Sequence, residues 1–246
     1  MRTFDQTHIT FLIVTIVFYA ITMFAISKMP RWAQNIMFGI GALICFGGLF
    51  FRYAMDFKFT LDFDFKTFAI QMMQVCNFNA ILVLLMLVPK FELARQYSIF
   101  FSLAAACTYM LSLPSNFASH NWYDVTILNS WLNHTFAIGL PLWMFAAGRL
   151  KPDKKYIWPV TLCVIAYFTV AYGCIEWLHS TGALAQNVSF SFIHDPGKIP
   201  FLVWFYKLIP MPYFYLFPLI PIMFGYFWVL AWFCRNRKAQ PFAKKR

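Results

Sequence analysis

The sequence predicts an all-α integral membrane protein, a bundle of seven transmembrane helices with its N-terminus outside and its C-terminus in the cytoplasm. Three observations predict this fold class. Hydrophobic residues make up 61% of the 246 residues and charged residues only 12%, about half the share found in a soluble domain. The apolar residues gather in windows long enough to cross about 30 Å of hydrocarbon. The basic residues lie mostly on one side of those windows.

Seven such windows follow one another, and together they form one transmembrane domain over residues 1–246. They lie near residues 8–27, 34–54, 67–88, 94–113, 126–146, 156–178 and 212–233. The first window is longer than a signal-peptide core and lacks a small-residue cleavage site, so we expect it to remain as the first helix. We expect residues 179–211 to form an outer loop. Within it, the sequence of residues 199–210 predicts an interfacial helix. Residues 234–246 form a basic cytoplasmic tail.

The net charge of +11 is mostly a topology signal. Fourteen of the 20 Lys and Arg residues fall on one side of the windows, in residues 28–31, 90–95, 149–155 and 235–246, and six fall on the other. Cytoplasmic loops of membrane proteins are rich in Lys and Arg, so the larger group faces the cytoplasm. We therefore expect a multi-pass protein of the plasma membrane whose partners are membrane lipids and not nucleic acid.

Several kinds of site are not expected from the sequence. The six cysteines lie in or beside the apolar windows and form no CxxC pair, which predicts thiols that form no disulfide and bind no structural zinc. We also expect no other metal and no cofactor. The deep parts of the windows contain no Asp, Glu, Lys or Arg, which disfavours an ion-coupled transporter. His134 is the one histidine deep in a window, so a haem between two histidines is not expected.

Cys76 and His134 are the candidate catalytic residues, because the sequence places them at one depth. Cys76 lies ten residues after Lys66 in the third window, and His134 lies ten residues after Asp124 in the fifth. At about 1.5 Å per residue, each lies about 15 Å from its outer anchor. A thiolate generated by a neighbouring imidazole can carry an acyl group as a thioester. A buried cysteine or histidine that only packs is the alternative.

Polar residues at similar depths could support this pair. Asn79 lies one turn from Cys76, Ser130 one turn from His134, and Asn133 beside His134, and any of them could orient the imidazole or donate to an oxyanion. The same counting places Tyr109 and Tyr172 at that depth. Arg52 and Glu176 lie near the outer interface, where they either form an ion pair or bind a lipid headgroup.

Four segments resemble one family of membrane proteins: Phe4-Asp5-Gln6-Thr7-His8, Gln74-Val75-Cys76, Leu132-Asn133-His134 and Gly148-Arg149-Leu150-Lys151-Pro152. In order and spacing the chain is similar to the bacterial YwaF-type membrane proteins. These resemble the transmembrane protein 164 acyltransferases and, more distantly, the androgen-dependent hydrolases of fatty esters. The resemblance implies that Cys76 and His134 match a catalytic cysteine and histidine in an enzyme that moves fatty acyl chains between phospholipids.

The expected function is therefore a cysteine-dependent acyltransferase. In this mechanism His134 takes the proton of Cys76, and Cys76 attacks an acyl ester and holds the chain as a thioester until a lipid acceptor is acylated. Two alternatives stay open. One is a lipase-like hydrolase in which water is the acceptor, and the other is a non-enzymatic lipid-binding or assembly protein.

Overall fold

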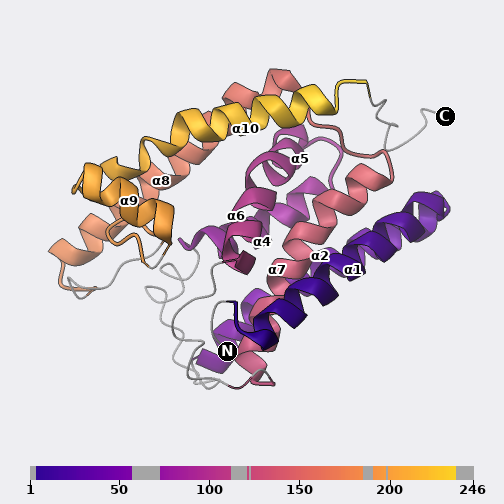
Figure 1. Cartoon of the computed structure of the whole chain (residues 1–246), viewed down its shortest axis with the longest axis horizontal. Coiled ribbons are helices and arrows are strands. Elements are labelled where there is room, and N and C mark those ends of the chain that lie inside the picture. The colour runs from indigo at the N-terminus through magenta and orange to yellow at the C-terminus, as the bar shows by residue number, and fades with distance from the viewer. Residues whose placement is uncertain are drawn as a thin grey trace.

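The computed structural model describes residues 4–56, 73–111, 121, 123–184, 191–197 and 199–236 (Figure 1). Within these residues the chain is helical and forms no strand. The α-helices are α1 (Gln6–Lys28), α2 (Arg31–Asp56), α4 (Val75–Met86), α5 (Glu92–Tyr97), α6 (Leu103–Leu111), α7 (Val125–Ala146), α8 (Ile157–Ser180), α9 (Pro200–Leu208) and α10 (Leu219–Phe233). A π-helix, η1 (Ser98–Ser102), joins α5 to α6, and two 3₁₀ turns, η3 (Lys154–Tyr156) and η4 (Phe214–Leu216), precede α8 and α10.

The apolar helices indicate a membrane protein, as the sequence predicts. Among the described residues, four helical stretches are long and apolar enough to cross a membrane: Gln6–Lys28, Arg31–Phe51, Lys154–Ser180 and Phe214–Phe233. They match the first, second, sixth and seventh predicted windows. Asp5 begins the first of them, because its carboxylate accepts a hydrogen bond from the backbone N–H of His8 at 2.8 Å.

The other three predicted windows are helical but do not meet the same criterion. The described part of the third window is α4, a helix of 12 residues, and the window's earlier residues lie outside the described part of the chain. The fourth window is α5, η1 and α6 in direct succession. The fifth window is α7, whose 22 residues reach about 33 Å but include Asn129, Asn133 and His134. The outer segment contains α9, nine residues long, where the sequence predicts an interfacial helix.

The helices form two outer groups, and further helices lie between these groups (Figure 1). The helices α1, α2 and α7 run side by side, and α8 lies beside α10 on the other side of the molecule. Between them lie α4, η1 and α6, which contact α7, and α5, which contacts α8. The helix α7 therefore touches α1, α2, α4, η1 and α6, and it links its own group to the helices that lie between the two groups.

The buried side chains of the described residues form two hydrophobic clusters. The larger lies along α7 and its neighbours and includes Trp143, Phe38 and Phe100. The smaller joins the C-terminal half of α8 to α9 and η4, with Ile175 and Tyr215 at its centre. Many outward-facing side chains are large and apolar, as expected where lipid replaces water.

Side-chain hydrogen bonds fasten α1 to α7. Only His8, Thr15 and Ile26 of α1 are fully buried, and the partly buried rings of Phe11 and Phe18 pack against Trp131 and Trp143 of α7. Three hydrogen bonds join the two helices: Trp131 Nε1 to Thr15 Oγ1 at 2.9 Å, the Tyr19 hydroxyl to the Thr135 carbonyl at 2.9 Å, and Trp143 Nε1 to Thr22 Oγ1 at 2.8 Å. In lipid, such bonds and close packing hold helices together, because lipid is as apolar as the helix surface.

The α2 to α7 contact is closer, and amide groups cross it. Asn133 Nδ2 donates to the Cys45 carbonyl at 3.0 Å, and Asn129 Nδ2 donates to the Gly48 carbonyl at 3.1 Å. A Cβ atom on Gly48 would lie 3.1 Å from Asn129 Oδ1 and 3.3 Å from Asn133 Nδ2. The absence of a side chain at Gly48 therefore allows the two backbones to approach.

Polar contacts tie several helix ends together at the basic end of the bundle. Gln34 Nε2 donates to the Ile26 and Met29 carbonyls at the end of α1, and Gln34 Oε1 accepts from Arg149 at 3.2 and 3.3 Å. Arg149 follows α7 and is buried, and this burial lowers the pKa of its guanidinium, as does the nearby charge of Arg31. A buried cation needs an acceptor, and Gln34 supplies one.

Candidate functional site

His134 lies within α7 and is held on two sides. Its ring stacks on that of Tyr109 from α6, with centroids 3.5 Å apart and planes 6° from parallel. Its Nδ1 lies 2.7 Å from the Ser130 backbone oxygen, and the Tyr109 hydroxyl lies 2.5 Å from Ser130 Oγ. The structure thus brings three of the predicted site residues together, with Ser130 and His134 buried and Tyr109 partly buried.

These contacts fix the tautomer of the imidazole. A backbone carbonyl can only accept a hydrogen bond, so the Nδ1 of His134 carries the proton. In the neutral ring the other nitrogen, Nε2, then holds a lone pair. That atom is buried inside the bundle. A general base needs such a nitrogen. Ser130 and His134 are four residues apart, so the hydrogen bond that fixes the tautomer forms within a single helix.

Cys76 lies in the first turn of α4. Its Sγ lies 3.7 Å from Asn77 Oδ1, and the residue is partly exposed. The N-terminal end of a helix carries partial positive charge, which favours a negative group there. The helix α4 packs against α7, the helix of His134. Contact between the Cys76 and His134 side chains themselves stays a prediction.

The start of α4 is held by a segment that lies far away in the sequence. Ser191 Oγ accepts from the Val75 N–H at 3.1 Å and donates to the Met73 carbonyl at 2.7 Å. The Tyr167 hydroxyl of α8 also donates to the Met73 carbonyl, at 2.5 Å, and lies 2.9 Å from Ser191 Oγ. The position of Cys76 therefore depends on α8 and on residues 191–197.

Unsatisfied polar atoms gather on the elements around this position. Four buried side-chain oxygens have no hydrogen-bond partner among the described residues: the Tyr97 hydroxyl on α5 and, on three further elements, Asn79 Oδ1 of α4, Ser102 Oγ of η1 and Thr135 Oγ1 of α7. These three elements contact one another. Buried polar atoms are normally paired, and π-helical turns occur often at functional sites. Together these features mark the region where α4, η1 and α7 meet as a candidate functional site.

Two other predicted residues point to different neighbours. Asn133 lies beside His134 in sequence, but its amide donates across to Cys45 of α2. Tyr172 stacks on Tyr213, with centroids 5.1 Å apart, and belongs to the smaller hydrophobic cluster. The structure therefore does not place them in the group formed by Tyr109, Ser130 and His134.

The two predicted headgroup-binding residues have different outcomes. Arg52 lies near the C-terminal end of α2, and its side chain lies outside the described part of the structure. Glu176 lies near the C-terminal end of α8, and its Oε1 is 2.8 Å from Nε2 of His194. An ion pair between Arg52 and Glu176 stays a prediction.

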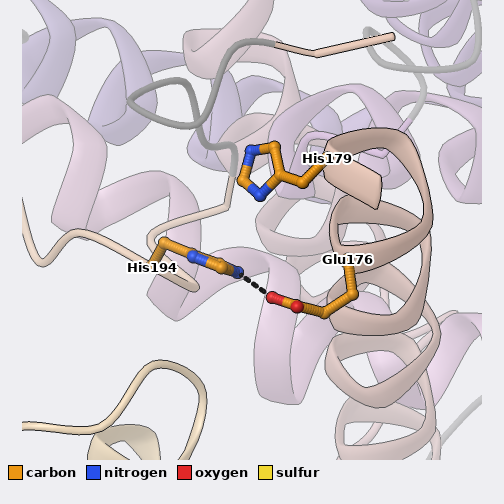
Figure 2. A group of neighbouring side chains, drawn as sticks. All are labelled: Glu176, His179 and His194. Atoms are coloured by element: carbon orange, nitrogen blue, oxygen red, sulfur yellow. Dashed lines mark ion pairs between the residues drawn. The ribbon is translucent and has the colours of Figure 1, made fainter. Parts of the chain in front are cut away.

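Glu176 belongs to a group of side chains that the sequence does not predict. Figure 2 shows Glu176 and His179 on α8, with His194 reaching them from the segment that follows that helix. One ligand atom from each lies within 4.8 Å of those of the other two. The spacing of Glu176 and His179, three residues apart on one helix face, is the one signal of this group in the sequence. The contribution of His194 depends on how the outer loop folds, which hydropathy does not predict.

No family model, no curated protein and no solved structure matches this chain. The resemblance to the YwaF-type proteins and to the transmembrane protein 164 acyltransferases stays a prediction. The candidate site therefore rests on its own geometry, which is centred on Tyr109, Ser130 and His134.

Proposed function

We propose that this chain is a membrane-embedded acyltransferase that carries a fatty acyl chain as a thioester on Cys76, with His134 as the general base. The observation that carries the proposal is the fixed tautomer of His134. Its Nδ1 donates to the Ser130 carbonyl, so Nε2 holds the lone pair that proton transfer from a thiol requires. Stacking on Tyr109 holds the ring in one orientation.

The proposed reaction has two balanced half-reactions. In the first, His134 Nε2 takes the proton from Cys76 Sγ, and Sγ attacks the carbonyl carbon of a phospholipid ester. The ester C–O bond breaks, and the departing lysolipid oxygen takes the proton back from His134. In the second, His134 takes the proton of an acceptor hydroxyl, whose oxygen attacks the thioester. The C–S bond then breaks, and the sulfur takes the proton from His134 to regenerate the thiol.

The surroundings of the dyad support this chemistry. The N-terminal end of α4 favours negative charge at Cys76. The hydroxyls of Ser102 and Thr135, which have no partner among the described residues, are available as donors to a developing oxyanion. They lie on η1 and α7, and both of these elements pack against α4, the helix of Cys76.

We further propose seven spans in the plasma membrane, with the N-terminus outside and the C-terminus in the cytoplasm. The basic asymmetry of the sequence supports this orientation. Contacts support it as well, because the ends of α1 and α7 meet through Gln34 and Arg149, and Lys151 Nζ donates to the Arg235 carbonyl at 2.7 Å. These basic segments share one end of the bundle, as loops on one side of a membrane would.

Mass spectrometry of the intact purified protein tests the covalent step. After incubation with phospholipid, we expect an acyl adduct that hydroxylamine removes, and we expect no adduct in Cys76→Ser. The matched control is Cys163→Ser, because Cys163 is also partly exposed and lies on a helix of the bundle. His134→Ala should slow adduct formation at least about a hundredfold, the lower end of what general-base catalysis contributes.

The same experiment separates the alternatives. Transfer to added lysophospholipid identifies a transferase, whereas release of free fatty acid at the same rate identifies a hydrolase. If wild type and Cys76→Ser are equally free of adduct and turn over no lipid, the non-enzymatic role replaces this proposal. If Cys76→Ser keeps full transfer activity, the covalent mechanism is wrong.

A further inference from the structure

The side chains of Glu176, His179 and His194 come together at the C-terminal end of α8. Glu176 Oε1 lies 2.8 Å from His194 Nε2, and the imidazoles of His179 and His194 meet edge to face with centroids 5.2 Å apart. One ligand atom of each residue lies within 4.8 Å of the other two (Figure 2). This arrangement offers two imidazole nitrogens and one carboxylate oxygen to a common point.

We propose that these three side chains bind a divalent transition-metal ion of the zinc type. Two imidazoles and one carboxylate are a ligand set that zinc accepts, whereas Mg²⁺ and Ca²⁺ prefer oxygen ligands alone. Bonds of about 2.0–2.1 Å at tetrahedral angles separate ligand atoms by about 3.3 Å. The present separations differ little from that value, since the longest is at most 4.8 Å and the distance from Glu176 Oε1 to His194 Nε2 is 2.8 Å.

The burial of the three side chains suits an open metal site. His179 is 6% exposed, so its ring is held by its surroundings, while Glu176 is exposed and can adjust its rotamer. Two of the ligands come from one turn of α8, and His194 closes the site from another segment. Three protein ligands leave a fourth coordination position for water or for a lipid oxygen.

A metal ion at this site would fix residues 191–197 against α8. The segment carries backbone strain, because Ser191 and Phe192 have φ of 56° and 59°, values that favour glycine. Two hydrogen bonds hold the segment: the Tyr215 hydroxyl donates to the Phe192 carbonyl, and the Tyr213 N–H donates to the Ile193 carbonyl. Ser191 also caps the start of α4, so the metal would stabilise the segment that positions Cys76.

An ion pair between Glu176 and His194 is the competing explanation, and cobalt binding separates the two. Protein without an affinity tag, stripped with a chelator and kept in detergent micelles, is titrated with Co²⁺ while visible absorption is recorded. We expect saturation at one equivalent, with the bands of a four-coordinate site, and displacement by Zn²⁺ but not by Mg²⁺. Glu176→Gln, His179→Asn and His194→Asn should each weaken Co²⁺ binding by more than about tenfold, the least that loss of even a supporting group costs.

Two controls make the result specific. Glu92→Gln removes a carboxylate that pairs with Arg95 on α5 and should leave Co²⁺ binding unchanged. His134→Ala removes the proposed general base and should also leave it unchanged, so failure of the acyltransferase proposal and failure of the metal site are distinguishable. The proposal is overturned if wild type binds Co²⁺ no more tightly than Glu176→Gln. Since Glu176 is exposed, that variant is expected to fold.

Discussion

Gly48 of α2 offers a sharp test of how the bundle packs, because its neighbour Gly47 provides a matched control. Both glycines lie in the same turn of the same helix. A Cβ atom on Gly47 would meet nothing within 4 Å, whereas one on Gly48 would lie 3.1 Å from Asn129 Oδ1 and 3.3 Å from Asn133 Nδ2. The perturbation is therefore one methyl group, placed in open space in one variant and against α7 in the other.

The size of the effect comes from comparing the two alanine variants. Alanine is favoured over glycine in a helix by about 1 kcal/mol, and this term applies at both positions and cancels. Crowding then remains at Gly48 alone, where overpacking of a close contact costs about 1–3 kcal/mol. The amides that must move are those that bond Cys45 and Gly48, which adds to the cost. We expect Gly48→Ala to be about 1–3 kcal/mol less stable than Gly47→Ala.

The free energy of unfolding in mixed micelles, titrated with denaturing detergent, measures this difference. Gly47→Ala should equal or exceed wild type in stability, and Gly48→Ala should lie between wild type and about 2 kcal/mol below it, because the gain in helix propensity offsets part of the crowding. Equal stability of the two variants would refute the close approach of α2 to α7. A second readout is available in acyl transfer, because Asn133 precedes His134, so a shift of α7 should lower the rate in Gly48→Ala and leave it unchanged in Gly47→Ala.

Two further predictions concern buried polar side chains, and each is measured as a change in the free energy of unfolding. His8 accepts from the Phe4 N–H at 2.8 Å and lies 2.7 Å from the Met110 carbonyl, so His8→Leu should cost about 1–3 kcal/mol, whereas exposed Thr10→Val should be nearly neutral. An unchanged His8→Leu protein would contradict the α1 to α6 contact. Gln34→Met should also cost about 1–3 kcal/mol, because it leaves the buried Arg149 guanidinium without this acceptor; a cost below about 0.5 kcal/mol would show that other groups suffice.

Element type and position are predicted well where the apolar run is long. The windows 8–27 and 156–178 match α1 and α8 to within two residues, because a long apolar run locates a helix even where a cap such as Asp5 sets its exact end. The window 212–233 is less accurate, since Pro212 and Pro218 delay regular helix until Leu219. The π-helical turn within the fourth window has no sequence signal, because it depends on how η1 packs against α4 and α7.

The sequence predicts the height of the site residues along their helices, but not the helix face that each side chain occupies. Counting along the helices places Tyr109 and His134 at one level, and the structure stacks them. The same counting includes Tyr172, which stacks on Tyr213 instead. Depth fixes height along a helix axis, while the face that a side chain occupies is set by tertiary packing. His194 lies in no window, so no counting along a helix could bring it to Glu176.

The bonds between α1 and α7 have a consequence for the order in which the protein assembles. Each joins residues 116 or 121 positions apart, so α1 is synthesised well before its partners exist. Its apolar surface allows it to reside alone in lipid during that interval. Thr15 and Thr22 have small polar side chains. The Thr22 hydroxyl can be satisfied without α7, because it donates to the Phe18 carbonyl of its own helix. The hydrogen bonds from Trp131 and Trp143 to the first helix can therefore form only after α7 has been synthesised.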